Sequence, residues 1–349
     1  MKKTLLIACM VLHSYCSAFA QELTKSIDSL VTACYEAAEF TGTVLVAKGG
    51  RIILRKVYGG NDDQAVYNIA SITKTFTAAL IMKLQEAGKL SVQDHLSKYY
   101  PDFPRANDIT IHHLLTHTSG VFNYTNDPAF WKLDQTKEQT LTQMIAWFKD
   151  KPLNFEPGTR FQYSNSGYTL LGYIIEQVTG TSYAKALEQI IFKPLGLHHT
   201  SFGPPADTSH LAPGYSMLNK DVKTKASVVH PSISYATGAI YSSAEDLYKW
   251  HTALQKEKFL SKQSLAAMYT KDKGVYGYGW FIDSLYGQQR LFHDGKISGY
   301  KSIIIRFPQD NICIIALSNA SNSGGNIIDN IMNILYHQPL KTRSRPPVK

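Results

Sequence analysis

The chain has 349 residues, enough for two subdomains with a sizeable hydrophobic core. Its formal net charge of +9 lies mostly at the two ends: without Lys2 and Lys3 it is +7, and without the basic residues Lys341, Arg343, Arg345 and Lys349 about +3 remains on the body. Beyond residue 20 no uninterrupted apolar run approaches the roughly 20 residues that span a bilayer, which excludes a transmembrane segment there.

The first 20 residues have the pattern of a secretory signal peptide. Two lysines precede the apolar run Leu5 to Leu12, and Ala18-Phe19-Ala20 is a small-x-small cleavage site. We therefore expect a periplasmic or secreted protein, for which nucleic acid is not an expected partner. A lipoprotein signal at Cys16 is the alternative, but His13-Ser14-Tyr15 matches poorly the small residues that such processing prefers.

A helix and a hairpin are predicted next. Glu22 to Phe40 is predicted to form an amphipathic helix with Leu30, Cys34 and Ala37 on its inner face. Gly42 to Tyr58 has the pattern of a β-hairpin, with an apolar strand on each side of a Gly-Gly turn.

Cys34 and Cys313 are the cysteines that remain after the signal. Both lie in apolar sequence, so we expect two buried thiols. A disulfide between them is the alternative, which an exported protein permits.

Residues from Ala70 to about Ala87 form the most apolar predicted helix, which ends at Gly88. Its apolar residues cover almost the whole circumference, so the helix is expected to be buried. Ser71 and Lys74 lie three residues apart at its first turn and therefore on one face. A hydroxyl beside an amine fits a nucleophile with its base, and the positive end of the helix dipole favours an alkoxide and a neutral lysine.

The Ser-x-x-Lys pattern alone is weak, because an N-cap serine followed by a solvated lysine gives the same letters. A second copy, Ser182 to Lys185, opens an amphipathic segment and is predicted to be an ordinary capped helix start. The apolar neighbours of Lys74 favour the catalytic interpretation for the first copy.

The region from Ser91 to Ser232 is predicted to be helical and rich in loops. Helices are expected at Ile111–Thr116, Leu141–Phe148, Thr169–Val178 and Tyr183–Ile191. The segments Phe122–Asp134 and Leu211–Ser232 are too irregular for a pattern, and we expect them to shape the substrate pocket.

A turn before the helix at Thr169 presents Tyr163 and Asn165. A phenol close to an ammonium loses its proton more easily and can pass a proton between nucleophile and leaving group. The amide of Asn165 can donate to a substrate carbonyl. The stretch Tyr124-Thr125-Asn126 has the same spacing without the turn-to-helix setting, and a packed tyrosine in a turn is the plain alternative for Tyr163.

His113 and His117 are four residues apart, as zinc ligands can be, but no glutamate base follows His113. Structural histidines are therefore expected, and we predict neither a metal nor a cofactor.

After Gly238 a helix at Ala244–Leu254 precedes an antiparallel meander and a final helix at Asn326–Leu335. The strands are expected at Gly279–Ile282, Arg290–His293, Lys301–Arg306 and Ile312–Leu317.

The second of these strands ends in His293-Asp294-Gly295-Lys296. Gly295 lets a ligand lie close to the strand, so the backbone N–H of Lys296 can point at a developing oxyanion. His293 can bind a carboxylate or help to hold a proton network.

These elements predict an α/β (α+β) protein in which an antiparallel sheet from both chain ends, flanked by helices, carries an all-helical insertion. The expected units are a sheet subdomain at 21–90 and 233–337, a helical subdomain at 91–232 and a disordered basic tail at 338–349. A cleft between the two subdomains is the natural place for a site.

Together, Ser71-x-x-Lys74, Tyr163-x-Asn165 and His293-x-Gly295 resemble, in order and spacing, the serine β-lactamase and penicillin-binding protein superfamily. The branch they resemble contains class C β-lactamases, D,D-carboxypeptidases and esterases. Further support comes from Leu114–Gly120, Phe155–Tyr168, Pro194–Leu197 and Ser242–Leu247.

The resemblance implies Ser71 as the acylated nucleophile and Lys74 with Tyr163 as the general-base system. It implies Asn165 and His293 as contacts to substrate and to the proton network, and the backbone N–H groups of Ser71 and Lys296 as the oxyanion hole.

The expected function is therefore a monomeric serine acyl hydrolase acting on a cell-wall-type D-amino-acid peptide, which makes peptidoglycan fragments possible partners, or on a small ester. The sequence has Tyr-Ser-Asn and His-Asp-Gly where class A β-lactamases have Ser-Asp-Asn and Lys-Thr-Gly. The missing lysine removes an anchor for a β-lactam carboxylate, and Asp294 is expected to add a negative charge near it. A class C-like β-lactamase and a non-catalytic wall-fragment receptor are the alternatives.

Overall fold

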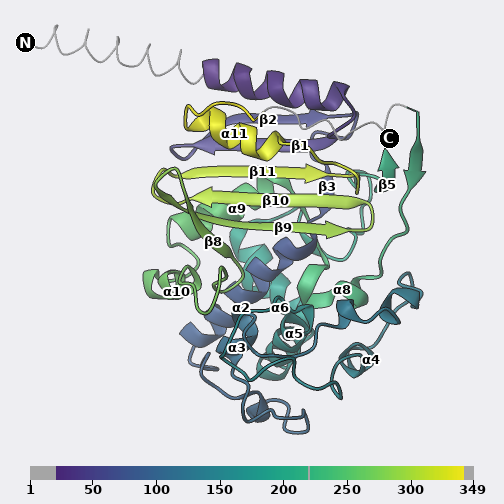
Figure 1. The fold of residues 1–349 in the computed structure, drawn as a ribbon, viewed down its shortest axis with the longest axis vertical. Helices are drawn as coiled ribbons and strands as arrows, with labels where there is room; N and C mark the ends of the chain where they lie inside the picture. Colours follow the sequence, from purple (N-terminus) through teal and green to yellow (C-terminus); the bar gives the residue numbers. More distant parts are fainter. Residues whose placement is uncertain (1–20, 219–220, 342–349) are drawn as a thin grey trace, which may run out of the picture.

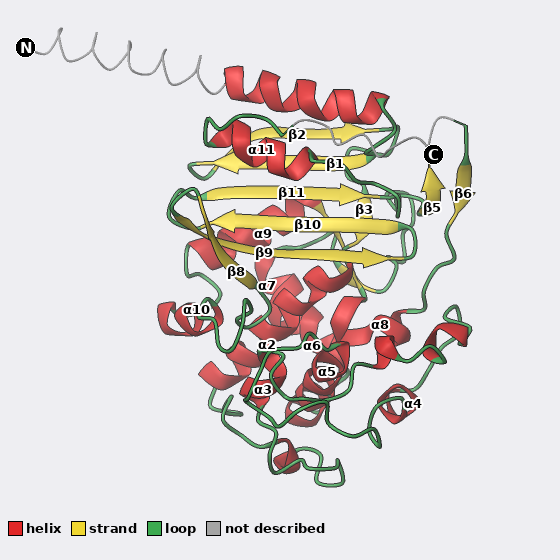
Figure 2. Cartoon of the chain, viewed as in Figure 1, coloured by secondary structure: helices red, strands yellow, loops and turns green. Residues whose placement is uncertain are grey.

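The computed structural model describes residues 21–218 and 221–341. The predicted signal at 1–20, and residues 342–349 of the expected basic tail, lie outside the described residues. Figures 1 and 2 show a sheet in the upper half of the view and most of the helices in the lower half. This arrangement agrees with the predicted fold class.

The main sheet is built from both ends of the chain, as predicted. Its strand order is β2-β1-β11-β10-β9-β8, and every neighbouring pair is antiparallel. The N-terminal hairpin therefore pairs directly with the last strand of the C-terminal meander. The strands are β1 (Gly42–Lys48), β2 (Arg51–Tyr58), β8 (Phe281–Leu285), β9 (Gln288–Ile297), β10 (Tyr300–Phe307) and β11 (Ile312–Ser318).

Helices cover both faces of this sheet. The helix at residues 21–36 and α11 (Ile327–Leu335) share an outer core with one face of β1 and β11. Helices α2 (Thr73–Glu86) and α9 (Ala244–Gln255) share the inner core with the other face. Because β1 and β11 are buried on both faces, their sequences are nearly continuous apolar runs rather than alternating ones.

The N-terminal helix uses a slightly different face from the one predicted. Leu30 is half-buried and Cys34 is buried, but Ala37 is exposed because it follows the end of the helix at residue 36. The buried positions before Cys34 are Leu23, Ile27 and Val31. Cys34 lies in the outer core and Cys313 in the inner core, so the sheet separates the two buried thiols and they do not pair.

Residues 91–232 contain most of the remaining helices, at or near the predicted places. They are α3 (Ile111–Leu115), α4 (Leu141–Ala146), α5 (Asn165–Thr179), α6 (Tyr183–Leu187) with a π-helical continuation (Glu188–Phe192), α7 (Lys193–Leu195) and the start of α8 (Pro231–Gly238). Helix α10 (Lys262–Met268) follows later in the chain.

The expectation that this insertion is all-helical is wrong in detail, because it also contains short strands. Strand β4 (Ser201–Phe202) joins β3 (Val66–Asn68) and β7 (Ile240–Ser243) in a three-stranded sheet. Strands β5 (Tyr215–Leu218) and β6 (Lys223–Lys225) form a separate pair. These strands are two to four residues long, too short for an alternating pattern.

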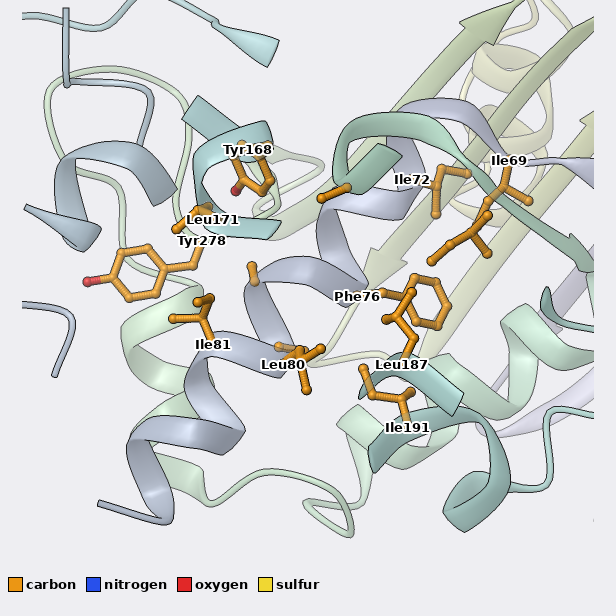
Figure 3. Close-up of a cluster of buried hydrophobic side chains, with 14 of the residues drawn as sticks. Ile69, Ile72, Phe76, Leu80, Ile81, Tyr168, Leu171, Leu187, Ile191 and Tyr278 are labelled. Carbon is orange, nitrogen blue, oxygen red and sulfur yellow. The ribbon is translucent and has the colours of Figure 1, made fainter. Parts of the chain in front are cut away.

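Helix α2 lies at the centre of the inner core. Its side chains from Thr73 to Met82 are all buried, although Lys83 is not. Figure 3 shows Phe76, Leu80 and Ile81 of α2 among buried side chains from α5, α6 and neighbouring segments. The ring of Phe76 also stacks on Trp250 of α9 at a centroid distance of 4.5 Å. The predicted burial of this helix is confirmed. Lys74 lies on this helix and is buried with it, as its apolar neighbours in the sequence indicated.

Residues 338–341 of the expected tail pack against α11. Lys341 forms an ion pair with Asp329 at 2.6 Å, and its backbone N–H donates to Asn330. No helix in the described residues has both the length and the apolar character needed to cross a membrane.

Candidate active site

Ser71 lies in a 3₁₀ turn, η1 (Ala70–Ile72), that leads directly into α2. The prediction had placed it in the first turn of the α-helix itself. Ala70 has a φ of +46°, a conformation that costs a residue with a Cβ free energy. The side chain of Asn68 accepts the N–H of Ala70 at 2.7 Å and helps to hold this turn. The strain is therefore located immediately before the candidate nucleophile.

Lys74 is completely buried, and its amine contacts Ser71. Lys74 Nζ lies 3.0 Å from Ser71 Oγ and donates to the carbonyl of Thr237 at 2.8 Å. No described carboxylate forms an ion pair with it. Burial lowers the pKa of Lys74 well below its ordinary value, although the more distant charge of Asp294 raises it. A neutral Lys74 keeps a lone pair that can accept the Ser71 proton.

Tyr163 approaches Ser71 from the other half of the molecule, with its phenol oxygen 3.2 Å from Ser71 Oγ. Burial raises the pKa of the Tyr163 phenol above its ordinary value, while the contact with Ser71 lowers it. Burial lowers the pKa of Lys74 and so disfavours the ammonium that was expected to help Tyr163 to lose its proton. Tyr163 is therefore a protonated phenol that can donate as well as accept.

The ring of His117 packs against the ring of Tyr163, a contact that the sequence did not indicate. The two rings lie 4.3 Å apart, and His117 Nδ1 accepts the backbone N–H of Ser164 at 3.2 Å. Burial lowers the pKa of His117 well below its ordinary value, so the ring is neutral and its proton is on Nε2. That nitrogen is buried without a hydrogen-bond partner among the described residues. His117 also has a φ of +58° beyond the end of α3, so it does not share a helix face with His113.

Asn165 is the first residue of α5 and lies at the edge of the same site. Its side-chain amide donates to Thr125 Oγ1 at 3.3 Å, and its backbone N–H donates to Asn123 at 3.1 Å. The stretch Tyr124-Thr125-Asn126, which the sequence interpretation set aside, thus orients Asn165.

Gly295 brings β9 against the turn that carries Ser71. A Cβ at this position would lie 2.7 Å from both the Ser71 nitrogen and the Ile69 oxygen. The glycine therefore accommodates the backbone of η1 rather than a ligand, which corrects the predicted reason for it. The adjacent Lys296 lines the same cavity as Ser71.

His293 is buried behind the site instead of facing a substrate. Its Nδ1–H donates to the carbonyl of Asp294 at 2.7 Å, and its Nε2 accepts the hydroxyl of Tyr276 at 2.8 Å. Burial lowers the pKa of His293 to about 3, which keeps the ring neutral. Of the two predicted roles, the geometry favours a part in the network over direct binding of a carboxylate.

Asp294 points away from Ser71, contrary to the expectation. Successive side chains of a strand face opposite sides of the sheet. Asp294 shares the outer face with Phe292 and lines a cavity there with Ile303 and Ile327. It therefore does not place its carboxylate where a substrate carboxylate near Ser71 would lie.

A cavity of about 430 Å³ opens at Ser71. Its lining includes the polar residues Asn165, Lys296 and Thr237, and the apolar residues Tyr124, Phe130, Trp131 and Val229. The predicted pocket segments Phe122–Asp134 and Leu211–Ser232 thus both contribute. The second Ser-x-x-Lys copy does not, since Ser182 is the N-cap of α6 and accepts the N–H of Lys185.

Comparisons with known proteins agree with this fold. A family model described as Beta-lactamase matches residues 27–337. Penicillin-binding protein 4* of Bacillus subtilis (strain 168) is 30% identical over 361 aligned residues, which cover 94% of this chain and 80% of that protein.

Two solved structures show the same likeness. A D-stereospecific amidohydrolase from Streptomyces sp. has a TM-score of 0.75 at 28% identity, covering 86% of this chain and 97% of that one. The octameric penicillin-binding protein homologue from Pyrococcus abyssi has a TM-score of 0.79 at 29% identity, covering 90% of this chain and 77% of that one.

The fold is that of the serine β-lactamase and penicillin-binding protein superfamily. Within it, the chain belongs to the Beta-lactamase family, whose model spans nearly all of the described residues.

Proposed function

We propose that this protein is an exported serine acyl hydrolase that forms an acyl-enzyme on Ser71. The observation that carries the proposal is the meeting of Ser71 Oγ with Lys74 Nζ at 3.0 Å and with the Tyr163 phenol at 3.2 Å, at a cavity of about 430 Å³. A nucleophile within hydrogen-bond reach of its base is the signature of covalent catalysis.

In the proposed mechanism, neutral Lys74 accepts the Ser71 proton as Oγ attacks the substrate carbonyl. The backbone N–H groups of Ser71 and Lys296 stabilise the oxyanion, a role supported by the close approach of β9 to η1. Tyr163 gives its proton to the leaving group and regains one from Lys74. Water then attacks the acyl-enzyme with Tyr163 and Lys74 as the base, and Ser71 recovers its proton.

The remaining site residues have supporting roles in this proposal. Asn165 exchanges its bond to Thr125 for one to the substrate carbonyl. His293 holds Tyr276 behind the site, and no metal or cofactor takes part. The substrate is an amide, peptide or ester, with peptidoglycan fragments as candidates, because a penicillin-binding protein and a D-stereospecific amidohydrolase are among the similar proteins. The predicted signal peptide supports the proposed export. We also propose that the enzyme is a monomer, as the sequence analysis expects.

Labelling with a fluorophosphonate tests the proposal. Intact mass is expected to show one adduct on the wild type and none on Ser71→Ala. The matched control is Ser182→Ala, which removes the serine of the second Ser-x-x-Lys copy and is expected to be labelled like the wild type. Equal labelling of Ser71→Ala and the wild type would reject the site.

Two further assays separate this function from the alternatives. Turnover of a chromogenic cephalosporin as fast as that of an activated ester would favour a β-lactamase. Binding of wall fragments without an adduct from a fluorophosphonate or a penicillin would favour a receptor.

A further inference from the structure

The cavity at Ser71 lacks an acidic side chain. Lys296 is the one charged residue among those that line it, and no aspartate or glutamate of the described chain does so. The nearby carboxylates are engaged elsewhere. Asp127 pairs with Lys151 at 3.1 Å, and Asp134 accepts the hydroxyl of Thr136 at 2.6 Å.

One set of residues that line the cavity is apolar and aromatic. Phe130 lies edge-on to Tyr124 at a centroid distance of 4.7 Å and edge-on to Trp131 at 5.5 Å. Tyr124 and Phe130 are each 2% exposed, whereas Trp131 is 60% exposed at the rim. Trp131 thus exposes apolar surface at the cavity that Ser71 also lines, and a bound apolar group would cover it.

An acyl group bonded to Ser71 has to lie in the cavity that Ser71 lines. Resting on the proposed function, we propose that the enzyme selects substrates whose acyl group is uncharged and has a sizeable apolar body, and that it discriminates against acyl groups with an ammonium. A buried ammonium needs a compensating anion, and no carboxylate of the described residues lines this cavity. Substrates with a free amine on the acyl side, such as unprotected amino-acid amides, are therefore poor ones, and their N-acylated forms are better.

Three p-nitrophenyl esters test this inference directly. The acyl groups are acetate, heptanoate and 6-aminohexanoate, of which the last two match in length and differ in a terminal methyl or ammonium. After subtraction of spontaneous hydrolysis, kcat/KM at pH 7 is expected to be at least tenfold higher for heptanoate than for 6-aminohexanoate. Equal values, or a preference for the amine through cation–π contact with Trp131, would overturn the inference.

Two cavity variants sharpen the test. Gln135→Glu places a carboxylate on the cavity wall and is expected to reduce the heptanoate preference at least threefold, whereas Gln135→Ala, which adds no charge, is not. Trp131→Ala is expected to lose more activity on heptanoate than on acetate. Tyr35→Ala removes an exposed aromatic outside this cavity and is expected to leave the heptanoate-to-acetate ratio unchanged.

The two proposals fail in different ways. Ser71-dependent hydrolysis of all three esters, with no difference between heptanoate and 6-aminohexanoate, overturns the inference and leaves the proposed function standing. Hydrolysis by Ser71→Ala at the wild-type rate overturns the proposed function and the inference with it.

Discussion

At the scale of single residues, the charge state of the site follows from burial without counter-ions. Lys74 is fully buried, and its amine contacts the hydroxyl of Ser71 and the backbone carbonyl of Thr237 instead of a carboxylate. A buried ammonium without an anion is costly, so burial lowers the pKa of Lys74 and favours the neutral amine, which can act as a base. His117 and His293 are neutral for the same reason, and each has a fixed tautomer set by a backbone contact. The site thus holds one base and several neutral donors.

His117→Ala is expected to lower kcat about tenfold or more, with a smaller effect on KM. The change leaves the Ser164 N–H without its acceptor and removes the ring under Tyr163, so the phenol is no longer held toward Ser71. His117→Asn keeps an acceptor near the position of Nδ1 and is expected to recover part of kcat. Steady-state kinetics on an activated ester measure both variants.

The control for this prediction is His113→Ala. It removes a histidine that accepts the backbone N–H of Thr110 at the start of α3. It is expected to cost stability and little kcat. A His117→Asn variant as slow as His117→Ala would show that the acceptor is not what positions Tyr163.

At the scale of elements, the site is made where three segments hold one another in strained or close-packed geometry. Turn η1 carries Ala70 at positive φ, and β9 lies against it at Gly295. Helix α8 is kinked at Tyr235, whose φ is +36°, and this kink precedes the carbonyl of Thr237 that binds Lys74. Such backbone strain persists only where the surrounding packing compensates for it.

Gly295→Ala is expected to lower kcat/KM about 100-fold while the protein still folds. The new Cβ would lie 2.7 Å from backbone atoms of Ile69 and Ser71, so η1 has to move, and a shift of about 1 Å at a nucleophile has an effect of that size. Kinetics on an activated ester and circular dichroism check both parts. The matched control is Gly324→Ala, where the nearest atom to a Cβ is 3.9 Å away. Wild-type activity in Gly295→Ala would mean that the close approach of β9 does not position Ser71.

At the scale of the whole molecule, burying neutral histidines makes stability depend on pH. Burial lowers the pKa of both His251 and His293 to about 3, and the charge of Arg306 lowers the pKa of His251 further. Below about pH 6.5 the unfolded chain takes up protons at these positions and the folded chain does not. The contribution of these two neutral histidines to the free energy of unfolding is therefore fully present above pH 6.5 and decreases as the pH falls toward 3.

Each of these histidines is expected to cost about 2 kcal/mol of unfolding free energy between pH 7 and pH 5, and urea unfolding at the two pH values measures it. His293→Gln keeps an acceptor for Tyr276 but cannot titrate. This variant is expected to lose less stability than the wild type over that interval, whatever its stability at pH 7. The same loss in both proteins would contradict the assignment.

The sequence alone determined the features that depend on local pattern. Apolar runs and helical spacing identified the hairpin, the C-terminal meander and the buried helix α2, since these patterns follow from which faces an element buries. The proximity of Ser71 and Lys74 also follows from spacing, because residues three apart on a helical turn face the same side. The resemblance of the three motifs, in order and spacing, to the serine β-lactamase and penicillin-binding protein superfamily then placed Tyr163, Asn165 and Gly295 in the same site as Ser71 and Lys74.

The tertiary structure decided what depends on contacts between distant segments. Thr237 and His117 reach Lys74 and Tyr163 through packing of α8 and of the loop after α3, and no local signal marks either contact. The face of the sheet on which the Asp294 side chain lies depends on the register of β9. A shift of one residue in that register would move every side chain of the strand to the opposite face. The uncharged, aromatic character of the cavity likewise arises only when irregular segments meet, because loops have no periodicity from which their packing can be predicted.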